Sequence, residues 1–426
     1  MTYRDVAVRL RAGAGWCVAL LGLSIPISTG ADNVLLALVV LAWIAALPVD
    51  WRASWRAFVS TPPLVAAAVF FAALVIGIVY SPVPASVAWS SSASKYSELV
   101  MMIALVWAAV SERTRRLALY FFLTAIVLNL IVSYSVGFEL VQGYPGLRTY
   151  PAYPIGFRLS VTHNILVSLA AFAGLLLARE ARKSMVRAGW IAFTVICAYN
   201  VLFMVIGRTG YVLLAVLVAY FFVTSIRGWR GPVACAVVLA CAFPAAYFGS
   251  ANFHSRVEAI ASDLSTWQPG AGDSTSVGQR VGYYRTSAQI VADHPLTGVG
   301  TGGFADAYAA KVKGTDAPAT TNPHNDYLIA GVQLGVPGML LMLVLYGTVW
   351  RSARHLPSRV ERDLARGVVL TMAIGGLFNS VLLDHTEGLL FAWAIAVLFA
   401  GYRRYSARRD EGGGMRDEAE LRSTSQ

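Results

Sequence analysis

The chain has 426 residues, of which 57% are hydrophobic and only 13% are charged. Soluble domains are usually about one quarter charged, so this composition excludes an ordinary soluble enzyme and indicates a membrane protein. The formal net charge of +11 is carried largely on short segments between apolar runs, which is typical of membrane topology and argues against a nucleic-acid partner.

Apolar runs recur along the chain and predict an all-α polytopic membrane protein. A helix needs roughly 20 mainly apolar residues to cross a bilayer, and most runs approach that length. The first run follows three arginines, but eleven further candidates make it an uncleaved first helix rather than a signal peptide. The twelve predicted spans are 15–30, 32–49, 63–80, 97–111, 116–138, 161–178, 188–206, 210–226, 232–250, 325–350, 367–384 and 387–402.

The lysines and arginines near the span ends predict the orientation of the chain. These residues are enriched in cytoplasmic loops of membrane proteins. With a cytoplasmic N-terminus, 25 of the 34 Lys and Arg residues lie inside, and five of the other nine lie in one long outer loop. Both termini are therefore expected in the cytoplasm.

This topology predicts four parts of the chain. The outer loop contains a helical spacing of apolar residues over 255–293, which the Gly-rich run "GVGTGGF" ends. The C-terminal tail is polar and Gly-rich, and is expected to be a disordered cytoplasmic end. The parts are 1–250 with the first nine spans, 251–322 as the large outer loop, 323–402 with the last three spans, and 403–426 as the tail.

Arginines on the outer side run against the positive-inside bias and are candidates for function. Arg208 lies in "GRTGY" between the seventh and eighth spans, where a neutral polar residue would serve a turn equally well. Helical spacing in "GQRVGYYRTSAQ" places Arg280 and Tyr284 on one face and turns Arg285 away from it.

A further arginine, Arg158, lies in "GFRLSVTHN" where the sixth span begins on the predicted outer side. His163 lies in the same stretch, and a polar contact inside the bundle is a sufficient explanation for it. Guanidinium groups bind phosphate oxygens bidentately and stay charged at any physiological pH. The outer arginines therefore predict a site for a lipid-linked pyrophosphate at the membrane surface. Lys95 and Arg148 either widen this basic region or are ordinary loop residues.

A bound metal is the other way to hold a pyrophosphate, and the sequence does not favour it. The outer segments contain no DxD, HExxH or carboxylate cluster, and "DHTEG" (384–388) is better explained as a polar cap on a short turn. The four cysteines fall in apolar runs without a CxxC pair, so neither zinc nor a disulfide framework is indicated. We expect no metal and no cofactor.

His324 lies where the outer loop meets the tenth span, in "NPHNDY". Imidazole titrates near neutrality and can take a proton from a hydroxyl group. Asn325 is expected to orient the ring or to cap the following helix. A histidine satisfied within a helix cap is the alternative, but the outer arginines favour a general base.

Three stretches together resemble the O-antigen ligase and O-antigen polymerase superfamily: "GRTGY", "GQRVGYYRTSAQIVADHPLTGVGTGGF" and "PHNDYLIAGVQLGVPGM". The resemblance rests on their order, spacing and sidedness, and it implies a GT-C-like glycosyltransferase in the inner membrane of a Gram-negative bacterium, with a periplasmic active site. It implies a glycan on undecaprenyl pyrophosphate as donor, lipid A–core as acceptor, and an inverting, metal-independent transfer. By this resemblance His324 is the general base, and Arg208, Arg280 and Arg158 bind pyrophosphate.

Within the superfamily, the chain length and the single dominant outer loop resemble the ligase branch more than the polymerase branch. A transporter of lipid-linked glycans is the rival from another class. Transporters often show internal repeats and polar groups at the bilayer midplane, and neither is evident in this sequence. The predicted order is ligase, then polymerase, then transporter.

Overall fold

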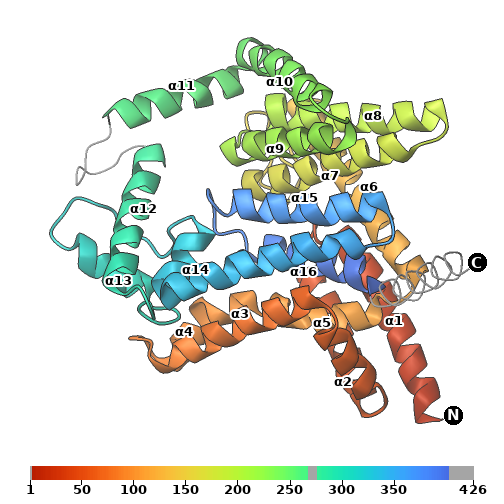
Figure 1. Cartoon of the computed structure of the whole chain (residues 1–426). Coiled ribbons are helices and arrows are strands. Elements are labelled where there is room, and N and C mark those ends of the chain that lie inside the picture. The colour runs from red at the N-terminus through yellow and green to blue at the C-terminus, as the bar shows by residue number, and fades with distance from the viewer. Residues whose placement is uncertain (1, 267–275, 403–426) are drawn as a thin grey trace, which may run out of the picture.

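The computed structural model of the protein describes residues 2–266 and 276–402 (Figure 1). In these residues the regular structure is helical, apart from one isolated β-bridge between Tyr150 and Tyr153. The all-helical class predicted from the sequence is therefore confirmed. The predicted disordered tail, 403–426, lies outside the described residues.

Nine helices in the described part of the chain are long and apolar enough to cross a membrane. Each corresponds to one of the twelve spans predicted from hydropathy, although several begin or end some residues away. The nine are α1 (Tyr3–Ser24), α2 (Thr29–Val59), α3 (Pro62–Val79), α6 (Glu112–Gly137), α7 (Ser160–Glu180), α8 (Ser184–Tyr199) with its continuation to Met204, α9 (Arg208–Ser225), α10 (Arg230–Gly249) and α14 (Asp326–Ser352).

The other three predicted spans correspond to shorter helices, namely α5 (Glu98–Ala108), α15 (Arg359–Gly375) and α16 (His385–Phe399). The predicted span 367–384 ends early because the chain leaves the helix after Gly375. The following segment is bonded to Asp326, whose backbone N–H donates to the carbonyl of Gly376 (2.8 Å) and whose carboxylate accepts from Leu382 N (3.2 Å). The total of twelve spans stays a prediction.

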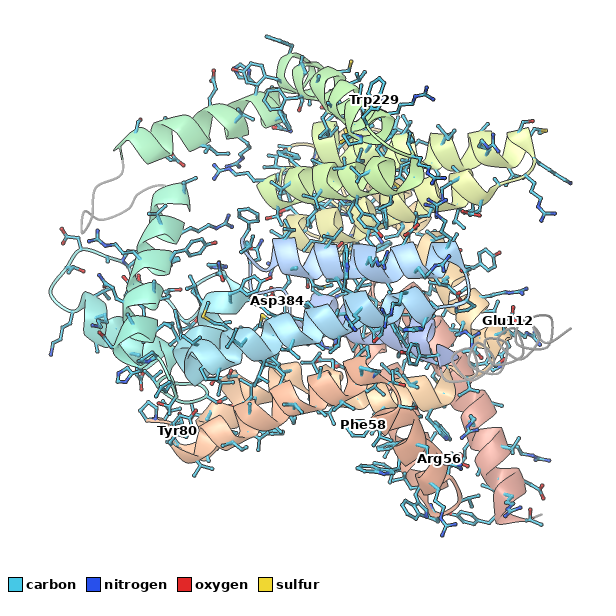
Figure 2. All side chains as sticks on the ribbon, viewed as in Figure 1. Arg56, Phe58, Tyr80, Glu112, Trp229 and Asp384 are labelled. Atoms are coloured by element: carbon cyan, nitrogen blue, oxygen red, sulfur yellow. The ribbon has the colours of Figure 1, made fainter. Side chains whose placement is uncertain are left out.

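Four shorter helices lie at one end of the bundle, on the left in Figure 1: α4 (Ala85–Ser91), α11 (Ala251–Thr266), α12 (Ser276–Asp293) and α13 (Phe304–Val312). Tyr80 at the end of α3 and Glu112 at the start of α6 mark opposite ends of the bundle in Figure 2. These four helices, which come from segments predicted to be on the outer side, therefore lie at one end. Helices α11 and α12 cover the described part of 255–293, where the sequence predicted a helical pattern.

The Gly-rich loop 298–304 is held between α3 and α14. Its backbone N–H groups donate to carbonyls of both helices, from Val299 to Val332 (2.8 Å) and from Thr301 to Gly77 (3.0 Å). Tyr80 adds a side-chain hydrogen bond to the carbonyl of Thr297 (2.8 Å). This loop therefore ties the end of α12 and the start of α13 to the helical bundle.

Helix α14 is broken at Gly335, which has a φ of +69° inside an otherwise helical segment. Here the N–H of Val336 donates to the carbonyl of Pro295 (2.8 Å), and Pro337 follows. A Cβ on Gly335 would lie 2.5 Å from the Pro295 carbonyl oxygen, so the chain crossing requires glycine.

We expect Gly335→Ala to lower the free energy of unfolding by about 1–3 kcal/mol, because alanine strains the positive φ and meets the Pro295 carbonyl. The apparent Tm in detergent or lipid discs measures the effect. Gly347→Ala is the matched control on the same helix, since no atom lies within 4 Å of its added Cβ. An equal Tm for the two variants would contradict the explanation.

Candidate active site

His324 lies in a strained turn directly before α14. Its φ of +54° is in the left-handed region, which costs a non-glycine residue about 1–3 kcal/mol and is seen more often at functional sites. Its N–H donates to the side-chain oxygen of Asn322 (2.8 Å), and its ring stacks on Tyr283 at 6.3 Å between centroids. These contacts hold the backbone of the turn and place the ring of Tyr283 beside the imidazole.

Asn325 caps α14, which is one of the two roles expected for it. Its side-chain oxygen accepts from Leu328 N (3.0 Å), and its side-chain nitrogen donates to the carbonyl of Leu377 (3.0 Å). Tyr284 on α12 donates to the same carbonyl (2.7 Å), and its hydroxyl oxygen lies 3.1 Å from the carbonyl oxygen of His324. These contacts fix α12, the His324 turn and the segment after α15 relative to one another.

Burial and the nearby Arg280 guanidinium lower the pKa of the half-buried His324 below its usual value of 6.5, because both disfavour the imidazolium form. At neutral pH this imidazole is therefore uncharged and has a lone pair available. A group in this state can accept a proton from a hydroxyl.

Arg208 begins α9 in a turn built on close packing with α7. A Cβ at Gly207 or Gly210 would lie 2.4 Å or 2.6 Å from atoms of Asn164. The two glycines of "GRTGY" thus let the start of α9 approach Asn164, and this approach positions the arginine. The Arg208 side chain is only 19% exposed, and its buried Nε has no hydrogen-bond partner among the described residues.

Three guanidinium groups gather around this turn. Arg256 on α11 and Arg280 on α12 both lie within electrostatic range of Arg208. Among the described residues, the carboxylate of Asp263 pairs with Arg208 at 4.0 Å. Three positive charges around this carboxylate leave an excess that favours an anionic ligand. We call Arg208, Arg256 and Arg280 the arginine cluster.

Arg256 is the functional candidate that the sequence interpretation missed. It lies in the long outer loop, where the positive-inside rule carries little information. The amphipathic helix that carries it, α11, was the available signal. Arg285 is exposed, as its position on the helix predicted, and it is not among the charges that act on Arg208.

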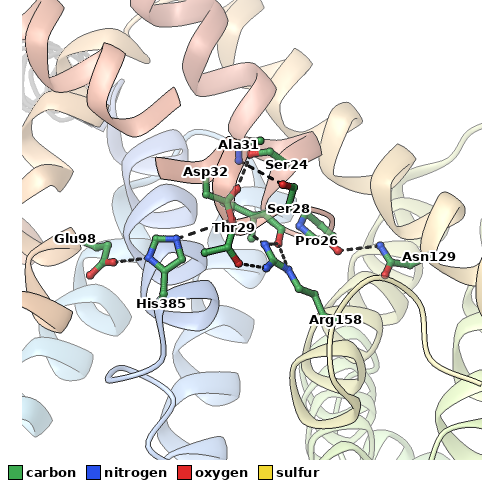
Figure 3. Close-up of polar contacts among 11 residues, drawn as sticks. Ser24, Pro26, Ser28, Thr29, Ala31, Asp32, Glu98, Asn129, Arg158 and His385 are labelled. Carbon is green, nitrogen blue, oxygen red and sulfur yellow. Dashed lines mark hydrogen bonds and ion pairs between the residues drawn. The ribbon is translucent and has the colours of Figure 1, made fainter. Parts of the chain in front are cut away.

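Arg158 lies in a different polar cluster (Figure 3). Its guanidinium donates to the carboxylate of Asp32 (2.7 Å), to the carbonyl of Ile25 and to the hydroxyl of Thr29. Asp32 is fully buried, so this ion pair is part of the packing between the α1–α2 connection and the start of α7. No hydrogen bond or ion pair joins Arg158 to the arginine cluster within the described ranges.

His163 lies inside the bundle, 1% exposed. Its Nδ1 accepts from Gly156 N (3.1 Å), and its Nε2 lies 2.8 Å from the side-chain oxygen of Asn200. These contacts match the polar bundle contact that the sequence offered as its explanation, and they leave His163 no access to the His324 turn.

The "DHTEG" segment begins α16. His385 lies 2.9 Å from a carboxylate oxygen of Glu98 through Nδ1 and 4.0 Å from Asp32 through Nε2 (Figure 3). Within the part of the chain that the structure describes, no group of three or more His, Cys, Asp or Glu side chains is placed to hold a metal ion.

Residues 183–343 match the family model described as O-antigen ligase. This match supports membership of the O-antigen ligase/polymerase superfamily. Members of this superfamily are glycosyltransferase-like ligases and polymerases associated with lipid-linked glycans and the bilayer. The match includes the whole arginine cluster and His324, but not Arg158 or His163. No curated protein matches the chain.

Proposed function

We propose that this superfamily member is an O-antigen ligase of the GT-C kind. It transfers a glycan from undecaprenyl pyrophosphate to the lipid A–core oligosaccharide at the periplasmic face of a Gram-negative inner membrane. The observation that carries the proposal is the arginine cluster next to an uncharged, half-buried His324 at the end of the bundle predicted to face outward. Such a site combines a binding place for a pyrophosphate with a base.

The proposed reaction needs only groups that this chain supplies. The acceptor hydroxyl attacks the anomeric carbon of the donor from the face opposite the pyrophosphate, and His324 takes the hydroxyl proton. The bond between the anomeric carbon and the pyrophosphate oxygen breaks, and undecaprenyl pyrophosphate leaves with the electron pair. The arginine cluster neutralises the charge that grows on the leaving oxygen. The transfer inverts the anomeric configuration.

An O-antigen polymerase uses the same donor chemistry and is the first alternative, differing only in its acceptor. A transporter has less support. Transporters often contain internal repeats, and none is evident in this sequence.

Purified protein with a synthetic undecaprenyl-pyrophosphate glycan and lipid A–core, in the presence of EDTA, tests the proposal. Glycan transfer to lipid A–core that survives EDTA supports a metal-independent ligase. Growth of the lipid-linked glycan without lipid A–core assigns the chain to the polymerase branch. Donor binding without any glycan transfer would favour the transporter function over the transferase function.

The pH dependence of kcat/KM tests the assignment of the base. A rate that requires neutral His324 is constant at neutral pH and falls tenfold per pH unit below the lowered pKa. The acidic limb is therefore expected below pH 6.5. In Arg280→Gln the limb is expected at higher pH, because one of the two causes of the low pKa is removed. A limb that stays in place in Arg280→Gln would contradict this assignment.

A further inference from the structure

A cavity of about 360 Å³ with both polar and apolar walls lies next to the His324 turn, and no arginine of the cluster lines it. Its volume is within the range of about 300–1,000 Å³ that is typical of small-molecule sites. Its polar walls come from α4 and the turn after it, from α13, and from the segment before His324. They include Ser90, Ser91, Ser92, Lys95, Asp306 and Asn322.

Gln333 of α14 lines the cavity and organises its wall. This side chain is fully buried, and its oxygen accepts from Gly302 N (2.9 Å) and from the Ser92 hydroxyl (2.5 Å). Gly302 has a φ of +82°, and a Cβ there would lie 2.7 Å from the Cα of Ala88. The Gly-rich loop, α4 and α14 are thus joined around one buried amide, so the cavity is formed before a ligand arrives.

The groups in the cavity suit a hydroxyl-rich ligand with a negative charge. In the described part of the chain, the hydroxyls of Ser90 and Ser91 both donate to the carbonyl of Val87, so their lone pairs remain available. Asp306 adds two acceptor oxygens at the surface. Lys95 is exposed and forms no ion pair among the described residues, and the exposed Asp384 lies within electrostatic range of it. The ammonium group of Lys95 can therefore bind an anion from solution.

Asn322 connects the cavity to the candidate active site. It lines the cavity, and its side-chain oxygen accepts from His324 N (2.8 Å) and from the Ser380 hydroxyl (2.7 Å). A sugar bound against Asn322 therefore lies beside the turn that carries the proposed base. The donor's pyrophosphate has its own partners in the arginine cluster.

We propose that this cavity binds the acceptor glycan, with Lys95 pairing with an anionic substituent such as a phosphate on the acceptor. The proposal rests on the proposed transferase function and adds the place and the chemical class of the acceptor. It also divides the outer end of the molecule into two binding regions, the arginine cluster for the donor and the serine-lined cavity for the acceptor.

Steady-state kinetics of the full-length protein in lipid discs tests this division, using lipid A–core in its phosphorylated and its dephosphorylated form. Ser90→Phe fills the cavity from α4, and Lys95→Ala removes the charge. Ser86→Phe, one turn earlier on α4 and exposed, is the steric control, and the exposed Lys313→Ala is the charge control. None of the four residues belongs to the arginine cluster or the His324 turn.

We expect Ser90→Phe to raise the KM for both acceptors. Lys95→Ala should raise the KM only for the phosphorylated acceptor, by about tenfold or more, because one charge-assisted contact is lost. The KM for the donor should not change in either variant, and both controls should match wild type.

An unchanged acceptor KM in both variants, with wild-type protein active, would overturn the acceptor cavity and leave the transferase function standing. A raised donor KM, or an equal loss with both acceptors in Lys95→Ala, would overturn it as well. Absence of transfer by the wild-type protein to either acceptor would instead be a failure of the proposed function.

Discussion

Replacing His324 with alanine is expected to lower kcat for glycan transfer by about 10²–10⁴-fold, the usual contribution of a general base. The imidazole is uncharged because burial and Arg280 lower its pKa, and its turn is held by Asn322 and Tyr284. The donor should still bind, since the arginine cluster is unchanged. Quantified transfer to lipid A–core, together with donor binding measured separately, checks both parts.

His294→Ala is the matched control for this variant. His294 follows α12 at the same end of the molecule, but its side chain is exposed. Wild-type kcat is expected for it. Because His324 has a positive φ, the Tm of His324→Ala must also be compared with wild type. Glycan transfer at the wild-type rate by a folded His324→Ala protein would show that His324 is not the general base.

Loss of the arginine cluster is expected to have the second large effect. Arg208→Ala and Arg280→Ala should each lower kcat/KM by about 10²–10³-fold, because each removes a fixed positive charge from the proposed site of the leaving pyrophosphate. Arg208 has the stronger structural argument, since its side chain is mostly buried and its Nε has no partner among the described residues. For each variant, transfer kinetics measure the loss of kcat/KM, and binding of undecaprenyl pyrophosphate measures the loss of donor affinity.

Two comparisons separate a specific role from general electrostatics. Arg285→Ala removes an exposed arginine from the same helix as Arg280 and should leave the rate near that of wild type. Arg208→Lys keeps the charge but loses the planar fork, so it is expected to recover only part of the activity. Equal losses in Arg280→Ala and Arg285→Ala would show that only the overall charge of α12 matters.

The fold class was predictable because a bilayer imposes its requirement on the sequence directly. Each spanning helix needs a run of apolar residues, and nine of the runs coincide with helices long enough to cross. The end of α15 was not predictable. Residues 376–384 are apolar enough to continue a helix, but their backbone is bonded to Asp326, which is far away in the sequence.

The candidate site was partly predictable for a similar reason. Arg208, Arg280 and His324 were visible as polar residues at outer span ends, where topology alone does not require them. The same logic selected Arg158, which the structure places instead against Asp32. This reasoning missed Arg256, because the positive-inside rule does not distinguish one charge from another within a long loop.

Hydropathy and short motifs are local properties, so they were sufficient to predict a helical membrane protein that resembles the O-antigen ligases. Which of the predicted outer charges lie together depends on how distant segments pack. Arg158 is paired closely with the buried Asp32, whereas Arg208 shares the more distant Asp263 with the charges of Arg256 and Arg280. Such pairings join segments more than 40 residues apart, and no local pattern specifies them.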